Sequence, residues 1–228
     1  MESVGGLKLK RPITDELRRS VVEDLSPEIN EIRNEELRRK AVEAWSLSLA
    51  SSSYARLADV PGWGDIDNFY LKRGNQPTHL RGVARMAMMV VDDFTRQFPD
   101  VVVDRDIVVC GALCHDLGKT YEFDPVNQKR WKGDPTKVGD PTFLHSVYGV
   151  HIALTAGLPE EVAHICLGHS REGVFITLST ECNIVREADH LWWTIACSLG
   201  MLQPNSIASA GPKMRPRKLS SEMGLAAE

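Results

Sequence analysis

The chain has 228 residues, of which 43% are hydrophobic and 25% are charged, with a formal net charge of −4. This balance is ordinary for a globular protein, the length suffices for a sizeable core, and the charge gives no reason to expect nucleic acid as an obligate partner. Five cysteines without a Cys-x-x-Cys pair argue against a disulfide framework and against a zinc ribbon.

No apolar run reaches the roughly 18 residues of a membrane-spanning helix, and the N-terminus has no apolar segment typical of a signal peptide. We therefore expect a cytoplasmic protein without a membrane partner. The sequence leaves open whether the chain forms a homo-oligomer.

The first 60 residues are predicted to form an N-terminal helical extension. A polar helix is expected over residues 14–25. Ser26-Pro27-Glu28 is then typical of an N-cap followed by proline at the first helical position, and it opens a second helix that runs towards Ala50. Residues 60–64, Val-Pro-Gly-Trp-Gly, predict a loop, and we place the boundary with a main domain over residues 61–202 there.

Two further helices precede the central motif. Residues 78–98 carry apolar side chains at helical spacing, and His79, four residues before Val83, falls on the buried side. Asp104 is a suitable N-cap for the next helix. We expect that helix to end at Gly118 in a left-handed conformation.

The sequence His115-Asp116-Leu117-Gly118-Lys119 lies at the end of this helix. A carboxylate in the last turn of a helix meets the negative end of the macrodipole, where an anion is disfavoured. Its neighbours are an imidazole and apolar residues. A bound cation would resolve this conflict, so the motif predicts a metal site.

The remainder of the chain alternates polar connections with helices. Residues 119–142 form a long polar stretch with Gly-Asp-Pro-Thr repeated, which predicts turns, and connections of this length are often lids. Helices are expected over 143–156, from Pro159 through His169, and from Ser179 or Thr180 to Leu199. The tail, residues 203–228, is expected to be flexible.

Six residues spread over these helices resemble the signature of the HD-domain metalloenzyme superfamily, H…HD…D with two additional histidines: His79, His115, Asp116, His145, His169 and Asp189. The resemblance covers about residues 78–199 and implies an all-α fold, an HD-domain helical bundle carrying the N-terminal helical extension. It also implies a first metal held by His79, His115, Asp116 and Asp189. Asp116 would bridge to a second metal held by His145 and His169, although His151 and His164 lie nearby in the sequence.

Four imidazoles and two carboxylates without a thiolate suit two divalent ions such as Fe, Mn or Co. Asp116 and Lys119 are the candidate catalytic residues. Lys119 follows Asp116 by three positions and is also a candidate for binding an anionic group of the substrate. Arg171 and His164 are weaker candidates for contacts with the substrate.

The resemblance implies a metal-dependent phosphohydrolase that acts on a small phosphorylated molecule or nucleotide through a metal-activated hydroxide. The alternative is an HD-type non-haem diiron oxygenase that cleaves a C–C or C–P bond of a small substrate with O₂. Both classes use the same order of ligands, so the six residues do not discriminate between them. A regulatory module with a decayed site is disfavoured because all six ligand positions are occupied.

Overall fold

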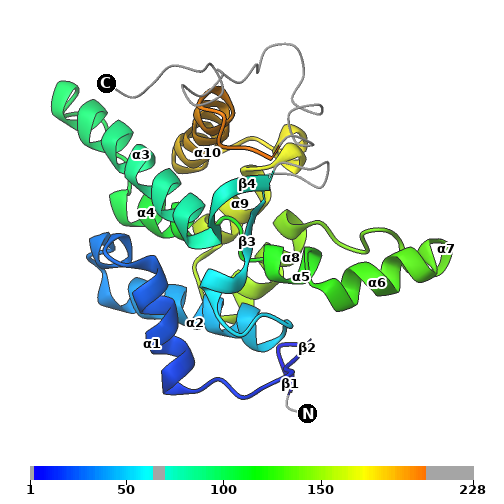
Figure 1. The fold of residues 1–228 in the computed structure, drawn as a ribbon. Helices are drawn as coiled ribbons and strands as arrows, with labels where there is room; N and C mark the ends of the chain where they lie inside the picture. The colour runs from blue at the N-terminus through cyan, green and yellow to red at the C-terminus, as the bar shows by residue number, and fades with distance from the viewer. Residues whose placement is uncertain (1–2, 64–69, 204–228) are drawn as a thin grey trace, which may run out of the picture.

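The computed structural model describes residues 3–63 and 70–203, and its fold is all-α, as predicted (Figure 1). The N-terminal elements are β1 (Ser3–Val4), β2 (Leu7–Lys8), α1 (Asp15–Leu25), η1 (Glu28–Glu31), α2 (Glu35–Ala50), η2 (Leu57–Asp59), β3 (Pro61–Trp63) and β4 (Tyr70–Asn75). They are followed by α3 (Gln76–Gln97), α4 (Arg105–Cys114), α5 (Lys119–Glu122), α6 (Pro125–Gly133), α7 (Pro135–Val138), α8 (His145–Thr155), α9 (Glu160–Gly168), η3 (Arg171–Phe175) and α10 (Thr180–Ser198). The strands form two small antiparallel pairs, β1 with β2 and β3 with β4.

Helix α4 is the central element of the bundle. All its residues from Ile107 to Cys114 are buried, as expected for a helix that is apolar on every side. It contacts α2, α3, α9 and α10, while α8 packs on α9. The C-terminal end of α4, which carries His115 and Asp116, therefore lies inside the protein.

The N-terminal helices belong to the same hydrophobic core as the later ones. Trp45 of α2 is fully buried, and its Nε1 donates a hydrogen bond of 2.9 Å to the carbonyl of Leu113. The Ser48 hydroxyl donates one of 2.7 Å to the carbonyl of Leu117. These two bonds give partners to one carbonyl at the end of α4 and to one in the turn that follows it.

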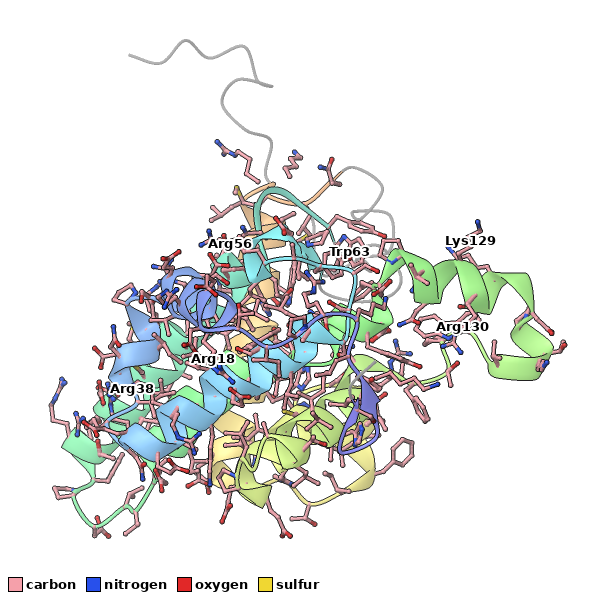
Figure 2. All side chains as sticks on the ribbon, turned by 90° about the horizontal axis from the view of Figure 1, so that it is seen from below. Arg18, Arg38, Arg56, Trp63, Lys129 and Arg130 are labelled. Carbon is pink, nitrogen blue, oxygen red and sulfur yellow. The ribbon has the colours of Figure 1, made fainter. Side chains whose placement is uncertain are left out.

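Ion pairs join the outer surfaces of the N-terminal elements (Figure 2). Arg18 of α1 lies 2.8 Å from Glu43 of α2, and Arg56 lies 2.8 Å from Asp24 of α1. The predicted boundary at residue 60 stays a prediction, and the predicted tail lies outside the described residues apart from Gln203. No described helix is both long and apolar enough to cross a membrane.

The prediction of a helix that starts at Pro27 was wrong for the first part of that helix. Ser26 is the C-cap of α1, and a single 3-10 turn separates it from α2, whose N-cap is Asn34. The cause is a tertiary contact, because the Asp106 carboxylate of α4 accepts hydrogen bonds from the backbone N–H groups of Arg33 and Asn34. The chain is thereby held in a turn between the two helices.

Two segments that were predicted as a loop and as turns, residues 60–64 and 119–142, contain regular structure. Pro61–Trp63 is strand β3 paired with β4, whereas Gly64 lies outside the described residues. Residues 119–142 contain α5, α6 and α7, of which α6 and α7 project to one side of the bundle (Figure 1). Trp131 of α6 is fully buried, and its ring lies 5.3 Å from that of Tyr121, which anchors an otherwise polar helix.

Gly118 does not have the predicted left-handed conformation. Helix α4 ends at Cys114, and Gly118 has a φ of −80°. Glycine is required there by space instead, since a Cβ atom would lie 2.0 Å from the carbonyl oxygen of His145 and 2.8 Å from the backbone nitrogen of Gly149. The turn after Asp116 is thus packed directly on the backbone of α8.

We expect Gly118→Ala to lower the free energy of unfolding by about 1–3 kcal/mol, because backbone atoms of α8 must move to admit the methyl group. Gly133→Ala is the matched control, since a Cβ there would meet nothing within 4 Å. Urea denaturation followed by circular dichroism measures both variants. Equal stability of the two would contradict the close approach of α8 to this turn.

Candidate metal centre

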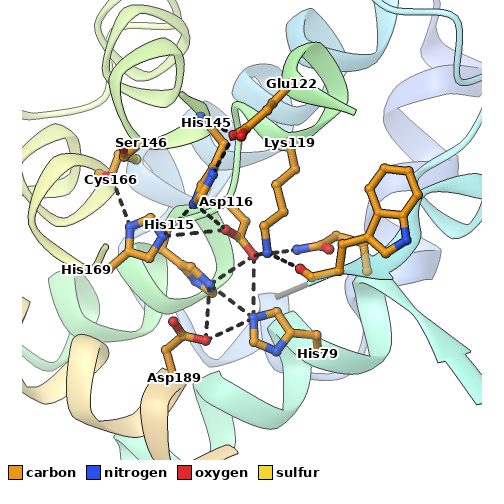
Figure 3. Close-up of polar contacts among 12 residues, drawn as sticks. His79, His115, Asp116, Lys119, Glu122, His145, Ser146, Cys166, His169 and Asp189 are labelled. Carbon is orange, nitrogen blue, oxygen red and sulfur yellow. Dashed lines mark hydrogen bonds and ion pairs between the residues drawn. The ribbon is translucent and has the colours of Figure 1, made fainter. Parts of the chain in front are cut away.

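The six residues singled out in the sequence come together at the C-terminal end of α4 (Figure 3). They come from five places in the fold: His79 in the first turn of α3, His115 and Asp116 after α4, His145 at the start of α8, His169 at the end of α9, and Asp189 in α10. All six are buried, with exposures between 0% and 8%. Buried ionisable groups at this density require compensating charges.

The first group consists of His79, His115, Asp116 and Asp189. His79 Nε2 lies 3.2 Å from His115 Nε2, 3.4 Å from Asp116 Oδ2 and 3.2 Å from Asp189 Oδ1. His115 Nε2 lies 3.1 Å from Asp116 Oδ2 and 4.0 Å from Asp189 Oδ1. Neighbouring ligands of an ion bound at about 2.1 Å are about 3 Å apart, so these four atoms could hold one divalent cation.

The second group uses the other oxygen of Asp116. Asp116 Oδ1 lies 3.6 Å from His145 Nε2 and 3.5 Å from His169 Nε2, and the two nitrogens are 3.3 Å apart. Asp116 therefore presents one oxygen to each group. This is the arrangement that a carboxylate bridging two cations requires.

The hydrogen bonds of three imidazoles show which nitrogen faces the centre. Nδ1 of His115, His145 and His169 lies 2.8 Å from the carbonyl of Ala112, 2.7 Å from Glu122 Oε2 and 2.9 Å from the carbonyl of Cys166, respectively. Because these partners only accept, Nδ1 carries a hydrogen, and in the neutral imidazole Nε2 then keeps its lone pair.

This protonation pattern leaves electron pairs facing one another. The Nε2 atoms of His145 and His169 cannot form a hydrogen bond if both carry lone pairs. Asp116 Oδ1 and Asp189 Oδ1 are buried and have no hydrogen-bond partner within the described chain. A cation in each group would satisfy all four atoms, so the residues present fit a pair of divalent metal ions.

Asp116 is held in place by two donors from the protein. Gln76 Nε2 lies 2.6 Å and Lys119 Nζ 2.7 Å from Asp116 Oδ2. Burial alone would raise the pKa of Asp116, but its contacts with His115 and the charge of Lys119 hold this pKa well below its ordinary value. The carboxylate is therefore an anion in spite of its burial.

Asp189 and His79 form a second buried ionisable pair, in which burial and close contacts also shift each pKa in opposite directions. Burial alone would raise the pKa of Asp189, but its close contact with His79 lowers the pKa below the ordinary value. Burial would lower the pKa of His79, and its close contacts with the carboxylates of Asp116 and Asp189 outweigh this and raise it. Two tryptophan rings, Trp192 and Trp193, lie 4.7 and 4.8 Å from the His79 ring and shield it from solvent.

The remaining predicted site residues differ in their positions. Lys119 is 2% exposed, and its ammonium also donates to the backbone carbonyl of Trp63, so it is engaged within the centre. His164 Nε2 accepts a hydrogen bond of 3.1 Å from the N–H of Ser179, the N-cap of α10. Arg171 is exposed at the start of η3. His164 and Arg171 lie outside the buried cluster, and their contacts with substrate stay predictions.

Two residues that contact the centre, Gln76 and Glu122, were not among the predicted site residues. Glu122 of α5 is fully buried, and its carboxylate accepts hydrogen bonds from both Nδ1 and the backbone N–H of His145. Its negative charge thus lies at the positive end of α8. The sequence offered one indication of their role, which is spacing. Gln76 precedes His79 by three residues and Glu122 follows Lys119 by three, and residues three apart lie on the same face of a helix.

A family model described as HD domain matches residues 78–193, which are 116 of the 228 residues. The matched segment contains all six residues of the centre. No curated protein and no solved structure matches the chain.

We expect Glu122→Gln to weaken the binding of one of two divalent ions by about 10–100-fold, because the carboxylate that orients the imidazole of His145 is lost. Calorimetric titration of Mn²⁺ into the chelator-treated chain measures both affinities. Glu172→Gln is the control, since the Glu172 carboxylate accepts a bond of 2.7 Å from Ser146 of α8 without touching a ligand. Two unchanged affinities in Glu122→Gln would limit Glu122 to a structural role.

Proposed function

The chain belongs to the HD domain family, whose members are generally metal-dependent hydrolases, and we propose that it hydrolyses a small phosphorylated molecule. The observation that carries this proposal is the pair of ligand groups sharing Asp116, each with buried electron pairs that no donor in residues 3–63 and 70–203 satisfies. Two divalent cations bound there would stabilise negative charge on phosphoryl oxygens and lower the pKa of a coordinated water.

The chain's own residues would prepare this site in three ways. Gln76 and Lys119 fix the carboxylate of Asp116, so that each of its oxygens stays directed at one group. Glu122 and the carbonyls of α4 and α9 fix the imidazoles with Nε2 inward. These groups are ordered before substrate arrives, which reduces the reorganisation needed during reaction.

Lys119 would also contribute its charge. Its ammonium lies beside the Asp116 carboxylate and 5.9 Å from the centre of the Trp193 ring, in a buried region where Lys119 is 2% exposed. A positive charge in such a region acts more strongly on a phosphoryl group than the same charge in bulk solvent. Lys119 is thus proposed to orient Asp116 and to favour an anionic substrate at once.

We expect the chain to release phosphate from phosphate monoesters or nucleotides under nitrogen when supplied with Mn²⁺, Co²⁺ or Mg²⁺. A phosphatase panel run with and without O₂ is the measurement. Turnover that appears only with iron and O₂ would overturn the proposal in favour of an HD-type diiron oxygenase.

His115→Ala and Asp116→Ala should each reduce turnover by about 100-fold or more, because each removes a group that positions charge at the reacting centre. Circular dichroism establishes that the variants fold. His190→Ala is the control: His190 adjoins Asp189 in sequence, but its side chain is 51% exposed and faces Glu187. Undiminished activity in either of the first two variants would remove the metal mechanism.

A further inference from the structure

A pocket of about 510 Å³ lies between the β3–β4 pair and the start of the projecting α6 helix. Trp63 lies at the junction between this helix and the body of the protein (Figure 2). The volume is in the range of small-molecule binding sites. The six ligand residues at which hydrolysis is proposed do not line this pocket.

Two residues of the pocket wall also touch the metal centre. Glu122 lines the pocket and binds the imidazole of His145 through Oε2 at 2.7 Å. Trp63 lines it as well, and its backbone carbonyl accepts a hydrogen bond from Lys119, which lies 2.7 Å from Asp116. The pocket is therefore one layer of side chains away from the bridging carboxylate. Its nearness to the centre makes it a candidate to hold another part of a molecule that reacts there.

One wall of the pocket is aromatic. The ring of Trp63 lies 5.1 Å from that of Tyr70 and 4.2 Å from that of Phe123, both in edge-on geometry. Such rings favour a flat apolar group, which they contact by stacking or by edge-to-face packing. A flexible polyol would leave them without a complementary partner.

The other walls offer polar groups, namely the side chains of Gln128, Lys132 and Asp140. The carboxylate of Asp140 and the amide oxygen of Gln128 are hydrogen-bond acceptors, so this side of the pocket suits a ligand with an N–H or O–H donor.

We propose that this pocket binds the part of the substrate that does not react, and that this part is a planar aromatic ring bearing an amino or hydroxyl donor. The inference rests on the proposed function, because it assumes that the reacting phosphoryl group lies at the neighbouring centre. The proposed substrate is therefore a phosphate monoester that carries such a ring.

The first test measures binding without catalysis. Ligand-detected NMR on the full, chelator-treated chain compares 4-aminobenzyl alcohol with cyclohexylmethanol, which lacks both the flat ring and the amine. We expect the aromatic alcohol to bind and the saturated one to bind at least about tenfold more weakly. Equal binding of the two would overturn the assignment.

Substitutions localise the binding to this pocket. Trp63→Leu removes the ring but keeps the backbone carbonyl that holds Lys119, and we expect it to weaken binding of the aromatic alcohol about tenfold. Phe175→Leu is the control, because Phe175 is an 86% exposed ring that does not line the pocket. Equal effects of the two substitutions would also overturn the proposal.

The second test separates this inference from the proposed function. The metal-loaded chain is assayed on 4-aminobenzyl phosphate and cyclohexylmethyl phosphate, whose leaving alcohols have similar acidity. Selective ring binding without hydrolysis of either ester supports the pocket and counts against the phosphohydrolase. Hydrolysis of both esters with equal kcat/KM supports the phosphohydrolase and overturns the pocket as its subsite.

Discussion

The buried carboxylate of Asp116 is the group on which the arrangement of the other five ligand residues depends. An anion at the end of a fully buried helix is costly in isolation. Here Lys119, one turn further along the chain, and Gln76, in the first turn of α3, each donate to the same oxygen. The second oxygen is left for His145 and His169, so a single side chain divides the centre into two halves.

The surrounding fold provides rigid supports for this division. The imidazoles of His115 and His169 are fixed by backbone carbonyls near the ends of α4 and α9, whereas His145 is fixed by the carboxylate of Glu122. The close contact of Gly118 with the backbone of α8 keeps His145 near Asp116. Small shifts of α8 would therefore alter the second half of the centre before the first.

The sequence predicts features that depend on local chemistry. Asp104 and Ser179 cap their helices as expected, because an N-cap needs only a side chain and the amides a few residues later. The six clustered residues were found from their order and from the anomaly of a carboxylate at a helix end. The helical bundle itself followed from apolar periodicity and from the resemblance.

Features set by distant contacts could not be predicted in this way. The turn at Arg33 and Asn34 depends on Asp106, which lies more than seventy residues away in the chain. Glu122 appears in the sequence as one charge in a polar stretch, and only the position of α8 makes it a partner of His145. Gly118 was recognised as special, but for a backbone angle instead of the space that it leaves for α8.

The hydrogen bonds from α2 to the end of α4 and the turn after it join the N-terminal helices to the segment that matches the family. Similarity defines a segment that begins at residue 78, yet Trp45 and Ser48 supply the donors for the carbonyls of Leu113 and Leu117. A fragment cut at the limits of the family match would lose these donors and uncover the apolar face that Trp45 covers. The segment that matches the family is thus smaller than the set of elements that share one hydrophobic core.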